Sequence, residues 1–163
     1  RDCALIYLGA GSVPAGVAAR AGRELAEALS CGVYVAGVSE AVQAVGDHEV
    51  TCAPRFDFAE LLPRARVFVH HGGQNSVMDA LSYEVPQVIV SGRVFERQFN
   101  AEAVENACCG LTVRESKLTL IARAARTLVD EPAPTSGIRG VRAELCALGG
   151  GARIVREVEE LVG

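Results

Sequence analysis

Short, uninterrupted apolar runs alternate along the chain with segments of helical periodicity, and this alternation restricts the fold more than any other feature. The runs expected to form strands are residues 3–8, 33–38, 48–53, 67–70, 87–91 and 110–113. The segments expected to form helices are about 16–30, 58–63, 74–83, 98–108, 117–129, 137–147 and 151–162. Buried strands that are each followed by a helix predict a parallel sheet covered on both faces. We therefore expect a doubly wound, Rossmann-like α/β fold with about six strands.

The size and charge of the chain narrow its function. Its 163 residues suit a single domain, so we expect residues 1–163 to form one unit. The formal net charge of -4 argues against binding to nucleic acid or an anionic membrane. No apolar run approaches the roughly 18 residues needed to span a bilayer, and the chain opens on a strand-like run where a signal peptide would stand. We expect a cytoplasmic protein.

The six cysteines show neither CxxC pairs nor ligand spacing with histidine, so we expect reduced thiols and no metal site.

Residues 70–76, HHGGQNS, carry the clearest chemical signal. They follow an apolar strand and begin a helix, where unpaired backbone amides and the positive end of the helix dipole favour an anion. Gly72 and Gly73 allow a ligand to approach the backbone, and His71 adds a ring donor. This pattern indicates a phosphate or diphosphate site. A helix start that is merely capped by Asn75 or Ser76, beside a structural histidine, would give the same residues.

Residues 70–90 (HHGGQNSVMDALSYEVPQVIV), together with ERQFNA at 96–101, resemble the C-terminal donor-binding domain of GT-B glycosyltransferases, especially the family that includes antibiotic and plant natural-product enzymes. The stretches YLGAGS and FDFAELLPRARVFVHHGG extend the likeness over most of the chain. The resemblance implies one half of a GT-B architecture. The whole enzyme would transfer a sugar from a UDP- or TDP-sugar to a hydroxyl of a small natural-product acceptor, with inversion. It would need no cofactor or metal ion, and no Asp-x-Asp motif is present.

The resemblance also implies roles for individual residues around the nucleotide sugar. His71 would touch the diphosphate, and Ser76 would hold a phosphate oxygen. Asp79, three residues further along the same helical face, would bind the ribose hydroxyls. The remaining contacts to the diphosphate would come from backbone amides or side chains of Gly73, Gln74 and Asn75. Ser12 is a second phosphate candidate, because its glycine-rich loop also follows a strand and precedes a helix. A plain turn would give the same residues.

Three departures from the family pattern concern the sugar, a turn and the base. Glu96 and Arg97 stand where the family has Asp-Gln or Glu-Gln contacting the sugar, so Arg97 would suit an anionic or unusual sugar. Glu84 replaces a glycine that often ends the helix in a left-handed conformation, so either the turn differs or strain is tolerated. The chain has no Trp for base stacking, so the backbone near Arg55 or the ring of Phe56 would serve.

The catalytic base and the acceptor pocket of the resembling enzymes lie in an N-terminal domain, of which this chain has no counterpart. We therefore expect no catalytic residue here, and we interpret His70, at a strand end, as structural. Two alternatives remain open. The chain could be a nucleotide-sugar-binding subunit that needs a separate membrane-associated partner or forms a homodimer, or a fragment of a GT-B-like nucleotide-sugar epimerase.

Overall fold

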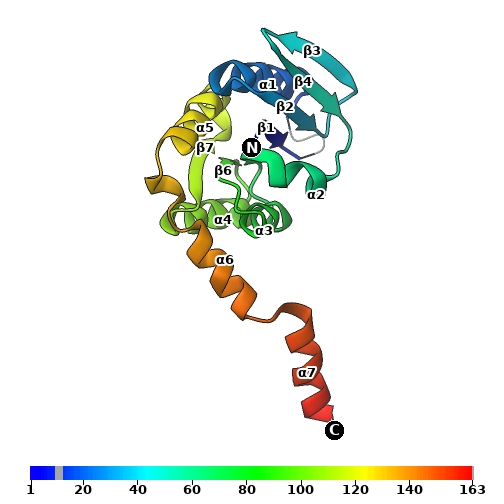
Figure 1. Cartoon of the computed structure of the whole chain (residues 1–163), viewed down its shortest axis with the longest axis vertical. Helices are drawn as coiled ribbons and strands as arrows, with labels where there is room; N and C mark the ends of the chain where they lie inside the picture. Colours follow the sequence, from blue (N-terminus) through cyan, green and yellow to red (C-terminus); the bar gives the residue numbers. More distant parts are fainter. Residues whose placement is uncertain (10–12, 163) are drawn as a thin grey trace.

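A computed structural model describes residues 1–9 and 13–162 as one sheet with helices on both faces (Figure 1). The strands are β1 (Cys3–Tyr7), β2 (Gly32–Ala36), β3 (Ala41–Val45), β4 (His48–Ala53), β5 (Ala65–His70), β6 (Gln87–Ser91) and β7 (Gly110–Arg114). The helices are α1 (Ala15–Leu29), α2 (Phe58–Leu61), α3 (Gln74–Ser82), α4 (Phe95–Asn106), α5 (Ile121–Asp130), α6 (Ile138–Ala147) and α7 (Gly150–Val162). Short 3-10 segments are η1 (Leu62–Arg64), η2 (Glu115–Leu120) and η3 (Ala133–Thr135).

The strand order is β3-β4-β2-β1-β5-β6-β7, and every pairing except β3 with β4 is parallel. The expected doubly wound α/β fold is therefore confirmed. The expectation of about six strands missed β3, which forms a hairpin with β4 through a two-residue turn at Gly46 and Asp47. This strand lies at the sheet edge and is mostly exposed, so it lacks the continuous apolar run that marks the others.

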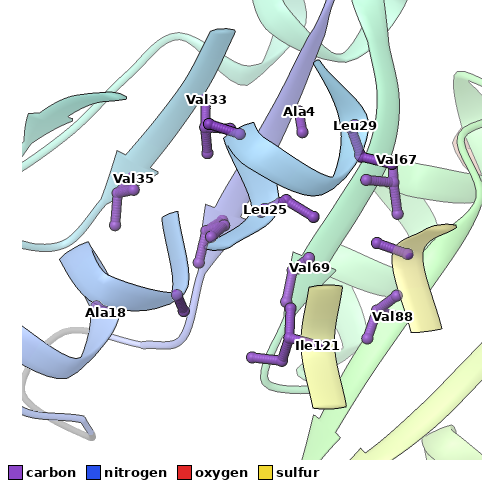
Figure 2. Close-up of a cluster of buried hydrophobic side chains, with 14 of the residues drawn as sticks. Ala4, Ala18, Leu25, Leu29, Val33, Val35, Val67, Val69, Val88 and Ile121 are labelled. Carbon is purple, nitrogen blue, oxygen red and sulfur yellow. The ribbon is translucent and has the colours of Figure 1, made fainter. Parts of the chain in front are cut away.

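Alternate residues along β1 divide the core into two layers. Ala4 and Ile6 face α1 and α5, in the cluster that also contains Leu25, Val69 and Ile121 (Figure 2). Cys3 and Leu5 face the opposite layer with Leu62, Phe68 and Ala80. Four of the six free cysteines, Cys3, Cys31, Cys52 and Cys109, are buried, whereas Cys108 and Cys146 are exposed.

Glu84 adopts a left-handed conformation with φ of 53°, as the glycine of the family pattern would. Its amide donates to Leu81 O, and the amide of buried Val85 donates to Ala80 O at 2.8 Å, a Schellman ending of α3. The turn is thus kept and the strain is tolerated. The carboxylate accepts from Arg142 at 2.7 Å and lies 3.6 Å from Arg139, which joins this turn to α6.

Helices α6 and α7 extend away from the sheet, and the C-terminus lies at the far end of α7 (Figure 1). Ile138 anchors the start of α6 in the core, but α7 exposes the apolar side chains of Ile154, Val155, Val158 and Leu161. In the described part of the chain, no helix combines the length and the apolar character that crossing a membrane requires.

Candidate functional site

The HHGGQNS segment lies at the carboxyl edge of the parallel strands, where open α/β sheets bind ligands. It joins β5 to α3, and the ends of β1 and β6 lie on either side of it because these strands flank β5 in the sheet. The backbone of Tyr7 and the loop after Ser91 therefore border the same edge as His71.

Gly72 and Gly73 permit a tight turn that side chains would block. Gly72 has φ of 84°, and a Cβ placed on it would lie 2.8 Å from Ile89 and 3.2 Å from the carbonyl oxygen of Arg97. A Cβ on Gly73 would lie 2.7 Å from His71 Nε2. The imidazole of His71 thus lies beside the backbone that begins α3, as a shared contact with an anion requires.

The N-terminus of α3 is free of side-chain capping. Gly73 is the N-cap residue, and no side chain accepts a hydrogen bond from the first amides of the helix. The alternative in which Asn75 or Ser76 caps the helix is therefore wrong. Gln74 and Asn75 are exposed, so the unpaired amides open toward solvent together with the positive end of the dipole.

One ring nitrogen of His71 is already engaged. His71 Nδ1 lies 3.4 Å from the carbonyl oxygen of Tyr7, which can only accept, so this nitrogen carries the proton and Nε2 of the neutral ring does not. Burial lowers the pKa of His71, and the nearby Arg97 lowers it further, while the Tyr7 carbonyl and Glu96 oppose the shift. An anion at Nε2 would favour the imidazolium, which carries a proton on both nitrogens.

Ser76 and Asp79 lie one turn apart on α3. Ser76 is only 6% exposed, and Asp79 is half-buried. Burial raises the pKa of the Asp79 carboxyl, because the charged form loses solvation there. Two vicinal hydroxyls would supply hydrogen-bond donors that compensate for this loss.

Arg97 and Glu96 take different positions at the start of α4. Arg97 is half-buried and lines a cavity of about 20 Å³ with His71, whereas Glu96 is exposed. The same cavity reaches Gly92 and Glu115, and Glu115 Oε2 would be 2.6 Å from a Cβ on Gly92. The sequence analysis missed Glu115, although its position directly after β7 puts it at the carboxyl edge.

The base-binding candidates lie in the loop after β4. Arg55 is exposed, and the half-buried ring of Phe56 packs edge-on against Tyr34 with centroids 5.3 Å apart. Stacking on Phe56 stays a prediction. Ser12, the second phosphate candidate, lies outside the described residues.

Three larger hollows occur in the described part of the chain, and two of them lie at opposite ends of the strands. One of about 560 Å³ lies at the carboxyl edge and is lined by Ser91, Gly92, Arg93, Gln98, Arg114 and Glu115. The other, of about 580 Å³, includes Glu84, Pro86 and Arg139 at the amino edge, and contains no residue of the predicted site. The first hollow continues the site because it shares Gly92 and Glu115 with the cavity beside His71.

Comparison with known proteins places the chain in a family. Residues 31–161 match the family described as the C-terminal domain of erythromycin biosynthesis protein CIII-like proteins. This chain belongs to that family. An EryCIII-like C-terminal domain has the architecture expected from the resemblance to GT-B glycosyltransferases, and the HGG segment lies within the matched residues.

The EryCIII-like domain is similar to two curated glycosyltransferases. It is 31% identical over 105 residues to the elloramycin glycosyltransferase ElmGT of Streptomyces olivaceus, covering 64% of this chain and 26% of the relative. It is 26% identical over 102 residues to the NDP-glycosyltransferase YjiC of Bacillus subtilis (strain 168), covering 61% of this chain and 26% of the relative. These matches thus span about a quarter of each relative.

A solved structure extends the likeness to nearly the whole fold. The glycosyltransferase SsfS6 of Streptomyces sp. SF2575, complexed with thymidine diphosphate, superimposes with a TM-score of 0.78 and 26% identity. The alignment covers 98% of this chain and 41% of SsfS6. More than half of SsfS6 therefore has no counterpart in the EryCIII-like domain described above.

Among the described residues, no three His, Cys, Asp or Glu side chains are grouped as a metal ion would require. The polar groups gathered at this edge are suited to an anion and to hydroxyl groups.

Proposed function

We propose that this chain is the donor-binding half of an inverting glycosyltransferase that transfers a sugar from a UDP- or TDP-sugar to a hydroxyl of a natural-product-like acceptor. The observation that carries the proposal is the uncapped N-terminus of α3, which lies beside His71 at the carboxyl edge of the sheet. The membership of this chain in the EryCIII-like C-terminal domain family supports it. The structure of SsfS6 in complex with thymidine diphosphate supports the choice of ligand.

In the proposed reaction, the acceptor oxygen forms a bond to the anomeric carbon as the bond from that carbon to the diphosphate oxygen breaks. The electron pair of the breaking bond leaves with the nucleoside diphosphate. The α3 amides, His71 and Ser76 bind this leaving group and stabilise the charge that develops on it. The acceptor proton passes to a base supplied by the remainder of the enzyme, so the residues of this chain bind and orient the donor.

Asp79 would accept hydrogen bonds from the ribose hydroxyls, which places the base toward the loop of Arg55 and Phe56. The sugar would then extend toward the hollow that contains Gly92, beside Glu96 and Arg97. Arg97 at this position favours an anionic or otherwise unusual sugar.

Calorimetry on this chain tests the proposal. We expect UDP or TDP to bind weakly, and we expect no turnover of a nucleotide sugar. His71→Ala and Ser76→Ala should weaken diphosphate binding more than binding of uridine or thymidine. Ser82→Ala is the matched control, because Ser82 is exposed at the far end of the same helix. Absence of heat with both diphosphates at millimolar concentration would overturn the donor-site assignment.

One observation also favours the alternative of a binding subunit. Val94, Phe95 and Phe99 are 48%, 80% and 61% exposed at the start of α4, next to the proposed sugar position. A surface of this kind is commonly covered by another domain or subunit. Titration of the purified chain against candidate partner chains by analytical ultracentrifugation would distinguish a subunit from a domain of a longer polypeptide.

A further inference from the structure

His70 and Asn100 are polar side chains buried beneath the HGG turn, and the proposed function gives them no role. Their exposed fractions are 0% and 8%. His70 ends β5, and Asn100 lies in the second turn of α4. The two residues come from different elements and meet at Gly72.

These side chains form hydrogen bonds with both backbone polar groups of Gly72, its amide and its carbonyl oxygen. Gly72 N donates to His70 Nδ1 at 3.1 Å, and Asn100 Nδ2 donates to Gly72 O at 2.8 Å. Because His70 Nδ1 accepts, the proton of the neutral ring is on Nε2. His70 Nε2 lies 3.0 Å from Gln87 Oε1 and donates to it. Gln87 is itself fully buried on the neighbouring strand β6.

Gly72 needs such support because its backbone leaves the strand in a left-handed conformation. The next residue, Gly73, is the N-cap of α3 and has no side chain. Without fixed hydrogen bonds at Gly72, two consecutive glycines would give His71 and the first α3 amides many orientations. His71 directly precedes Gly72, and the other polar groups that would contact a diphosphate follow Gly72 by one to four residues.

We propose that His70 and Asn100, with Gln87 orienting the His70 ring, are positioning residues that hold Gly72 and thereby align His71 and the α3 amides for the donor diphosphate. The inference rests on the proposed function, since it concerns the same ligand. It assigns to buried side chains, which touch no substrate, a specific effect on diphosphate affinity.

Two substitutions at position 70 separate positioning from folding. His70→Leu removes the acceptor for Gly72 N, whereas His70→Asn keeps a side-chain oxygen that can accept from the amide two residues ahead, as in an Asx turn. Asn100→Leu removes the donor to the Gly72 carbonyl. Each variant is first checked for a cooperative thermal transition.

Calorimetry with UDP and TDP, and with uridine and thymidine, gives the first readout. We expect His70→Leu and Asn100→Leu to lose about fivefold to a hundredfold in diphosphate affinity, as loss of one buried hydrogen bond would imply. Nucleoside affinity should be retained, and His70→Asn should stay within about threefold of the wild type. Wild-type diphosphate affinity in folded His70→Leu, or equal losses for both ligand classes, would overturn the positioning role.

Amide hydrogen exchange at Gly72 and Gly73, followed by NMR without ligand, gives the second readout. Exchange should accelerate at these amides in His70→Leu and return toward the wild-type rate in His70→Asn. Unchanged exchange in His70→Leu would overturn the inference even if the wild type binds neither diphosphate. Failure of the wild type to bind either diphosphate would overturn only the proposed function, so the two failures are distinguishable.

Discussion

His70 should make the fold sensitive to acid, because complete burial lowers its pKa to about 3 from an ordinary value of 6.5. Loss of solvation is the main cause, and the charge of His71 adds to it, whereas the hydrogen bond to Gln87 acts in the opposite direction. In the unfolded chain the same imidazole takes up a proton near pH 6.5. The folded pKa is depressed, so the stabilising contribution is fully present above pH 6.5 and is lost as the pH falls toward 3.

The magnitude follows from the difference in bound protons. Each pH unit below 6.5 should cost about 1.4 kcal/mol, which gives about 2 kcal/mol at pH 5 and about 3 kcal/mol at pH 4. These losses are large beside the roughly 5–15 kcal/mol that stabilises a typical domain. His70→Asn removes the titrating ring and keeps an acceptor for Gly72.

Urea denaturation of both proteins between pH 7.5 and 4 measures the effect. The variant should be less stable at neutral pH, because it loses the contact of the His70 ring with Phe68, whose centroid is 4.7 Å away. The two curves should converge on acidification, with a difference in slope near 1.4 kcal/mol per pH unit. His48→Asn controls for removing a histidine from a strand. Parallel curves for wild type and His70→Asn would refute the reasoning.

Three further outcomes concern the site and its turns. Diphosphate affinity should rise as the pH falls from 8.5 to 7 in the wild type but not in His71→Gln, because Nε2 of His71 donates only when protonated. The same pH dependence of affinity in both proteins, measured by calorimetry, would contradict this. Gly73→Ala should displace the His71 ring and weaken diphosphate binding about tenfold, whereas Gly140→Ala, which has open space at its Cβ, should not; equal affinities would be contrary evidence. In urea, Glu84→Gly should be about 1 kcal/mol more stable than Glu84→Ala, since both lose the Arg142 pair and only glycine avoids left-handed strain; equal stabilities would exclude that strain.

The strands that run through the core were predictable because burial on both faces leaves a continuous apolar run. β3 was not, since it is an edge strand that pairs on one side and exposes Val42 at 64%. The beginning of α4 was also placed too late. Phe95 and Phe99 are four residues apart on α4, but both side chains face solvent. The first turn of α4 therefore lacks the buried apolar face by which a helix is predicted from sequence.

The position of the candidate site could be predicted from the HGG segment, because glycines after a strand and before a helix indicate an anion site in local sequence alone. Contributions from distant parts of the chain could not. Glu115 reaches Gly92 only because β7 and β6 are neighbours, and Asn100 reaches Gly72 only because the start of α4 contacts the turn after β5. These contacts depend on strand order, which one sequence does not specify.

The interpretation of His70 as structural is confirmed by its complete burial, but the structure gives that term a particular meaning. A leucine at this position would fill the core and would leave the Gly72 amide without a partner, so packing does not explain a histidine there. A buried neutral imidazole both accepts at Nδ1 and donates at Nε2, and it meets partners for both at Gly72 and Gln87. His70 therefore lowers the stability of the fold at acidic pH, and its hydrogen bond fixes the backbone at Gly72. Under the proposed function, His70 holds the turn, and His71, its neighbour in sequence, contacts the diphosphate.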